Sequence, residues 1–70
     1  MARRALRVVR LGEADAERVG GAGFEAGRSG RVPSWVNPYL AGTAYAEVWE
    51  MGWFEGRREW VEGRREVDLG

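Results

Sequence analysis

The clearest pattern in the chain is a tandem repeat, WFEGRRE at residues 53–59 followed by WVEGRRE at residues 60–66. The two units match at six of seven positions, and the remaining position changes Phe54 to Val61. A period of seven is two turns of a helix that keeps one face toward one partner. The face continues in steps of three and four through Ala46, Trp49, Trp53, Gly56, Trp60, Gly63 and Val67. This pattern predicts one long helix with large and small residues along a single seam.

Regularly spaced glycines mark a second predicted helix at residues 13–29. Glu13 and Asp15 suit its first turn, and Gly30 suits a C-terminal cap. An interior glycine costs roughly 1 kcal/mol relative to alanine, so several of them indicate that packing needs the missing side chains. The small residues step by four and three along one face: Ala16, Gly20, Gly23, Gly27 and Gly30. We interpret this face as a groove for a helix or for flat rings; a flexible Gly-rich linker is the alternative.

Residues 30–42 form a connector that contains Pro33 and Pro38. It is too apolar to lie free in water, so we expect Trp35 or Tyr39, or both, to fold back over the helices. Thr43 is a good N-cap for the long helix, which we predict at residues 43–67. The predicted architecture is all-α: one domain over residues 1–70, built as a two-helix antiparallel hairpin in which tryptophan rings cross the glycine groove. The predicted helix-packing residues are Gly20, Gly23, Phe24, Gly27, Tyr39, Trp49, Gly52, Trp53 and Gly56.

The long helix extends beyond the partner expected for it. In an antiparallel hairpin, the shorter helix cannot cover Trp60, Gly63 and Val67. Uncovered apolar residues of this kind are typical of interaction surfaces. We therefore expect these three residues to contact a second copy of the chain, as a homodimer through the long helix, or another protein.

Composition excludes several kinds of chemistry. The 70 residues include no Cys and no His, and all 11 basic residues are Arg. Disulfides, the usual zinc ligands and a catalytic Lys are therefore absent. No phosphate-binding motif is present, so we expect no enzyme activity, no cofactor and no metal. No apolar run approaches a membrane span and no signal peptide is evident, so we expect a cytoplasmic protein without membrane contact.

The net charge of zero hides an uneven distribution. Residues 1–12 carry four arginines and no acidic residue, whereas residues 43–70 carry four arginines and seven acidic residues. The first segment reads as a basic arm that contacts phosphates through Arg3, Arg4, Arg7 and Arg10. A frayed, solvated terminus is the alternative.

Residues 23–56 resemble the ribosome modulation factor family. The resemblance rests on the block GFEAGRSGR at residues 23–31, Asn37-Pro38-Tyr39, Gly42-Thr43, and WEMGWFEG at residues 49–56. The Asn-Pro-Tyr and Gly-Thr elements are most similar to its divergent, CrpP-like branch. The resemblance implies two short helices, binding to the small ribosomal subunit, and ribosome dimerisation and hibernation in bacteria.

By this resemblance, Arg31 is the charged motif position expected to contact ribosomal RNA. Members of the better-known branch are strongly basic, whereas this chain is neutral with an acidic long helix. An ATP-dependent drug-modifying activity proposed for the CrpP branch is not carried over, because Lys and a phosphate-binding motif are missing. The sequence therefore predicts a ribosome-associated translation modulator. The alternative is a self-associating helical module that binds protein and no RNA.

Overall fold

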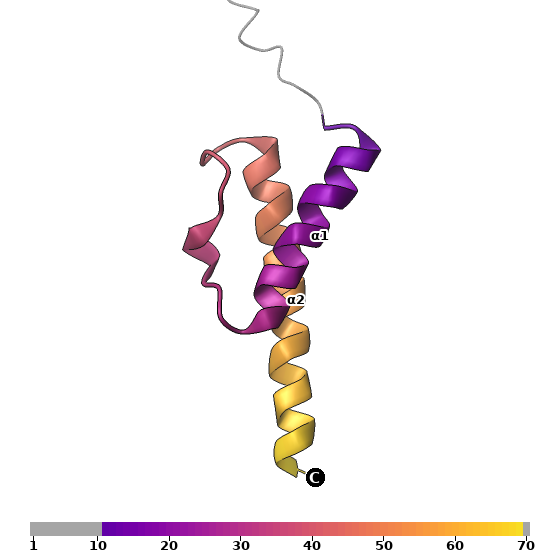
Figure 1. Ribbon diagram of the computed structural model, residues 1–70, viewed down its shortest axis with the longest axis vertical. Coiled ribbons are helices and arrows are strands. Elements are labelled where there is room, and N and C mark those ends of the chain that lie inside the picture. The colour runs from indigo at the N-terminus through magenta and orange to yellow at the C-terminus, as the bar shows by residue number, and fades with distance from the viewer. Residues whose placement is uncertain (1–10, 70) are drawn as a thin grey trace, which may run out of the picture.

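A computed structural model describes residues 11–69, with side-chain surroundings for residues 11–65. It contains helix α1 (Glu13–Ser29), a short 3-10 helix η2 (Ser34–Val36) and helix α2 (Ala44–Leu69) (Figure 1). Among the described residues there is no strand, which confirms the all-α, two-helix architecture. Helix α1 spans the predicted residues, and α2 continues two residues beyond its predicted end.

Local capping sets the ends of the helices. The Thr43 hydroxyl accepts a 3.1 Å hydrogen bond from the backbone N–H of Ala46 and donates one of 2.7 Å to the Leu40 carbonyl. Gly30 ends α1 in the left-handed conformation, at φ 74°, and its N–H donates to the Gly27 carbonyl. Glycine adopts this conformation without the steric penalty that a side chain brings. Both caps were readable from the sequence.

The two helices run in the same direction (Figure 1). Gly23 packs against the Trp49 backbone, Gly27 against the Trp53 backbone, and Gly30 against the Trp60 ring, so residue numbers rise together along both helices. The predicted antiparallel direction is therefore wrong. A helical hairpin needs a turn of only about two to five residues. The connector here is long enough to return along α1, which is about 25 Å in length.

Specific contacts hold this returning connector against α2. The Val32 carbonyl accepts a 2.7 Å hydrogen bond from Trp53 Nε1, and Asn37 Nδ2 donates 2.9 Å to the Ala46 carbonyl. Tyr39 stacks on Tyr45, with ring centroids 5.5 Å apart. The connector thus passes from the middle of α2 back to its N-terminal end.

Of the two connector aromatics, one folds back and the other does not. Tyr39 packs against the core, whereas Trp35 is 82% exposed. Trp35 lies on η2 and borders a groove against α2 without being covered. The expectation that the connector covers the helices therefore holds for Tyr39 alone.

Four glycines bring the helix backbones into direct contact. A Cβ at Gly23 or Gly27 would overlap a backbone carbonyl of α2, and a Cβ at Gly52 or Gly56 would overlap one of α1. Such crossings allow Cα–H groups to touch carbonyl oxygens, each a weakly favourable contact. The contacts are reciprocal because each helix contributes two glycines four residues apart.

The backbone of α2, rather than a row of indoles, therefore fills the glycine groove of α1. The indoles of Trp49 and Trp53 lie beside the crossing, where they form the core with Val19. All three side chains are at most 7% exposed. This corrects the prediction that tryptophan rings cross the groove: a groove lined by glycine admits a helix backbone more closely than it admits a ring.

Candidate nucleic-acid interface

Arg57 closes the C-terminal end of α1. Its Nε donates to the Gly27 carbonyl and its Nη2 to the Val32 carbonyl, both at 2.9 Å. Its guanidinium also lies 4.3 Å from the centroid of the Trp53 ring. The last carbonyls of a helix have no partner within the helix and carry partial negative charge, so a cation is favourable there. Arg57 thus joins α1, the connector and α2 at one point.

Trp60 occupies the next position along the same surface. Its half-buried indole packs directly on Gly30, where a Cβ would overlap the ring. Two guanidinium groups lie near the ring, that of Arg57 at 5.3 Å and that of Arg64 at 4.8 Å from the ring centroid. Cation–π contacts of this kind stabilise the ring position and concentrate positive charge around an aromatic face.

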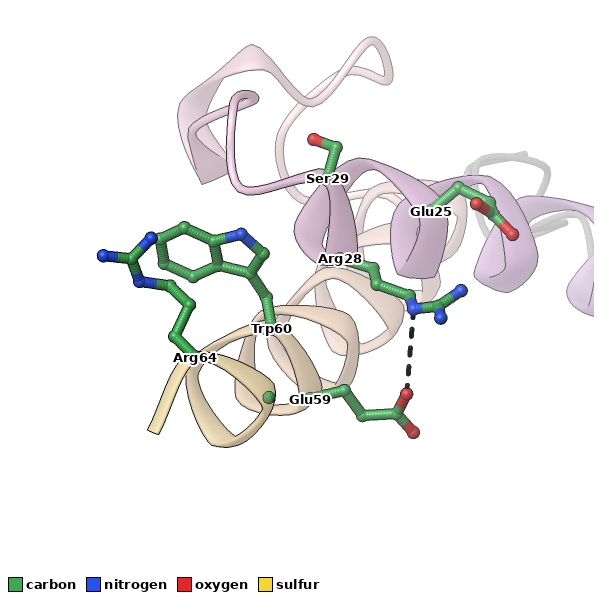
Figure 2. Close-up of a pocket in the computed structure, with 7 residues that line it drawn as sticks. Glu25, Arg28, Ser29, Glu59, Trp60 and Arg64 are labelled. Carbon is green, nitrogen blue, oxygen red and sulfur yellow. Dashed lines mark ion pairs between the residues drawn. The ribbon is translucent and has the colours of Figure 1, made fainter. Parts of the chain in front are cut away.

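An open groove of about 570 Å³ lies beside this indole (Figure 2). Trp60 and Arg64 lie on one side of it, and Arg28 faces Glu59 on the other. The Arg28 Nε to Glu59 Oε1 distance is 4.0 Å, and both side chains are more than half exposed. An exposed pair at that distance contributes little, so Arg28 is free to turn toward an anion. Glu25, Ser29 and Gly63 complete the lining.

Arg31, the RNA contact expected from the motif, follows Gly30 directly in the chain. Its side chain is exposed, and its backbone N–H donates 3.0 Å to the Ser29 hydroxyl. The structure therefore places Arg31 at the end of α1 that Trp60 and Arg57 of α2 contact. Guanidinium groups bind phosphates through paired N–H donors, and an indole offers a face on which a base stacks.

The basic arm cannot be compared with this surface. Arg3, Arg4, Arg7 and Arg10 lie outside the described residues.

Three arginines at this surface were not predicted from the sequence: Arg28, Arg57 and Arg64. An antiparallel hairpin places the end of α1 far from Arg57, so nothing in that arrangement suggested a capping role. The available signal was the spacing of Trp53, Arg57, Trp60 and Arg64 at steps of four and three, which places them on one side of α2.

The other predicted residues divide between the crossing and open solvent. Gly20 and Phe24 present their backbone carbonyls to Gly52 and Gly56. Of the three self-association candidates, Trp60 packs on its own chain, and a Cβ added at Gly63 would meet no atom within 4 Å among the described residues. The Val67 side chain lies outside the described part.

Two further findings concern the described residues only. No helix within residues 11–69 has both the length and the apolar character needed to cross a membrane. Among the side chains that the structure describes, those of residues 11–65, the acidic groups do not gather in a cluster able to hold a metal ion. A comparison of the chain with protein-family models, with curated proteins and with solved structures finds no match.

Proposed function

We propose that the protein binds ribosomal RNA in the cytoplasm and modulates translation, as the motif resemblance implies. The observation that carries this proposal is a group of exposed arginines at the end of α1. Arg28 and Arg64 line the groove beside the half-buried Trp60 indole, and Arg31 follows Gly30, on which that indole packs. Arg31 is the point where the motif block and this group coincide. Positive charge with an adjacent stacking face is typical of surfaces that bind single-stranded nucleic acid.

Local charge has to provide the attraction, because the whole chain is neutral. Each phosphate contact releases counterions and steepens the salt dependence of binding by about 0.7–0.9 in log–log slope. Stacking of one base on an aromatic side chain contributes about 1–3 kcal/mol and depends little on salt. The proposed surface therefore combines a salt-sensitive contribution from Arg31 and its neighbours with a salt-insensitive contribution from Trp60.

Sedimentation with purified ribosomes tests the proposal. The protein is added to ribosomes at low and moderate salt and followed through a sucrose gradient. We expect it to travel with the ribosomal particles, and we expect Arg31→Ala and Trp60→Leu to reduce that fraction. Arg18→Ala is the matched control, because Arg18 is exposed and pairs with Asp15 away from the groove. The variant with all four arm arginines changed to Ala measures the contribution of residues 1–12.

Protein that stays at the top of the gradient at both salt concentrations would contradict ribosome binding. Equal loss for Arg18→Ala and Arg31→Ala would indicate general charge attraction rather than this surface. The alternative, a protein-binding module without RNA, is favoured by one specific observation. Large apolar side chains remain exposed on α2: Met51, Phe54 and Val61.

A further inference from the structure

The exposed face of α2 carries a regular stripe that the fold of one chain leaves uncovered. Its residues follow steps of four, three, four, three and four: Glu47, Met51, Phe54, Arg58, Val61 and Arg65. All six are exposed, and the apolar members Met51, Phe54 and Val61 are 65%, 57% and 45% exposed. This spacing is the heptad pattern by which helices pair side by side. We call these six residues the outer stripe.

The outer stripe lies opposite the glycine crossing. Gly52 and Gly56 contact α1, and Phe54 is two residues from each, or about 200° around the helix axis. The connector occupies a third side, through its contacts with Ala46 and Trp53. The seven-residue repeat therefore produces two seams. One is covered by α1 and the connector, and the other is open.

We propose that a second copy of this chain binds the outer stripe, with the two α2 helices antiparallel and related by a two-fold axis near residue 56. In such a dimer, residue i of one copy meets residue j of the other, and j meets i. The stripe then pairs with itself as three combinations, each occurring twice. They are Glu47 with Arg65, Met51 with Val61, and Phe54 with Arg58.

Each of the three pairings is chemically favourable. Glu47 and Arg65 have opposite charges, Met51 and Val61 are apolar, and the Phe54 ring offers its face to the Arg58 guanidinium. A parallel dimer in register would instead place Glu47 on Glu47, Arg58 on Arg58 and Arg65 on Arg65. Like charges directly opposite each other are destabilising, so the charge pattern selects the antiparallel dimer.

The connector adds to one end of this surface. Trp35 is 82% exposed and lines a groove together with Glu47 and Glu50. An arginine that pairs with Glu47 from the second copy would therefore also lie beside the Trp35 ring. In the dimer, a tryptophan that is largely exposed in one chain thereby becomes part of a binding surface.

The small size of the surface indicates a weak dimer. From Glu47 to Arg65 the stripe is about 27 Å long, or five helical turns. A contact between two single helices of that length buries less than the roughly 800 Å² per partner of a standard stable interface. We therefore expect a dissociation constant of about 10–100 µM, so that monomer and dimer interconvert with concentration.

Charge reversal tests both the surface and its register. Sedimentation velocity from about 5 to 500 µM gives the dimer constant of the unchanged protein and of Glu47→Arg, Arg65→Glu and the double variant. Each single reversal places like charges at both ends of the dimer and should weaken it about tenfold. The double variant should recover the original strength. The two positions are too far apart to meet within one chain, so recovery must arise between copies.

A mixture provides the sharper measurement. In a complex of the Glu47→Arg chain with the Arg65→Glu chain, both end pairs are again oppositely charged. The equimolar mixture should therefore dimerise more strongly than either variant alone. The substituted side chains are exposed, so each variant should remain helical, which circular dichroism checks. A protein that is monomeric up to 500 µM, or a mixture no stronger than its components, overturns the proposal.

Disulfide trapping checks the direction independently of charge. The natural chain has no cysteine, so Met51→Cys and Val61→Cys introduce the only thiols. The mixed variants should form a disulfide dimer on mild oxidation, because the two residues face each other. Met51→Cys alone should not, because its two copies lie about 15 Å apart along the helices, beyond disulfide reach. A disulfide formed by Met51→Cys alone would indicate a parallel dimer and would refute this one. The result does not depend on ribosome binding, so the two proposals fail separately.

Discussion

Replacing Gly27 by alanine tests the backbone crossing most directly. A Cβ at this position would overlap the Trp53 carbonyl oxygen and approach the Arg57 backbone nitrogen. Both neighbours belong to the backbone of a helix, so no side-chain rotation relieves the overlap, and the two helices must separate. The same movement lengthens the 2.9 Å hydrogen bond from Arg57 Nε to the Gly27 carbonyl. The substitution therefore disturbs the crossing and the cap of α1 together.

The expected magnitude follows from three contributions. Alanine is favoured over glycine in a helix by about 1 kcal/mol. Overpacking costs about 1–3 kcal/mol, and backbone neighbours favour the upper end. Weakening the Arg57 hydrogen bond costs about a further 1 kcal/mol. The net loss is about 3 kcal/mol, or about 12–24 °C in Tm for a domain of this size. Thermal melting followed by circular dichroism measures it.

Two other glycines serve as matched controls. Gly21 in α1 and Gly63 in α2 have no neighbour within 4 Å of an added Cβ among the described residues. Gly21→Ala and Gly63→Ala should therefore gain the helix preference without the overlap and raise Tm by a few degrees. If Gly27→Ala melts at or above the unchanged protein, as these controls do, the helices do not cross at Gly27 and the reasoning fails.

Three further predictions concern the polar contacts around the core. Trp53→Phe keeps an aromatic ring, although a smaller one, and removes the Nε1 donor to the Val32 carbonyl; the lost hydrogen bond should cost about 1–2 kcal/mol in urea unfolding, to which the lost indole volume adds, and an unchanged midpoint would contradict this contact. Arg57→Lys keeps the charge but loses the planar fork that reaches two carbonyls, and should lower Tm by about 5–10 °C, with Arg58→Lys as the exposed control. Asn37→Ala removes the hydrogen bond from the connector to the Ala46 carbonyl. Amide hydrogen exchange near residue 37 should therefore accelerate, whereas exchange at the helix crossing should change little.

The helix bounds and caps were predictable because they depend on local sequence. Thr43 and Gly30 lie where capping chemistry requires them. The glycine spacing also identified the contact faces of both helices. The direction of packing was not predictable in this way, because a glycine face has the same pattern read forward or backward. The discriminating fact was the length of the connector, which exceeds what a hairpin turn needs.

The candidate interface was predictable only in part. Arg31 was identified by its place in the motif, without any geometry. Arg57 and Trp60 depend on which end of α1 they meet, so the antiparallel prediction gave them other roles. Trp60 in particular read as an uncovered residue at the end of a long helix. In the parallel arrangement it meets Gly30 and becomes part of the chain's own fold.

The parallel crossing also constrains how the chain folds. In a helical hairpin, contacts form first beside the turn and then extend outward, so each new contact closes only a short loop. Here the helix-to-helix contacts join residues 26 to 32 positions apart along the whole crossing, from Gly20–Gly52 to Gly30–Trp60. The first contact must close a loop of that size, and the entropy this costs is offset only when further contacts between the helices form. Folding should therefore be slower than in a helical hairpin of equal length. If the connector were cut once, the two helices would be separate molecules, and their association would depend on protein concentration.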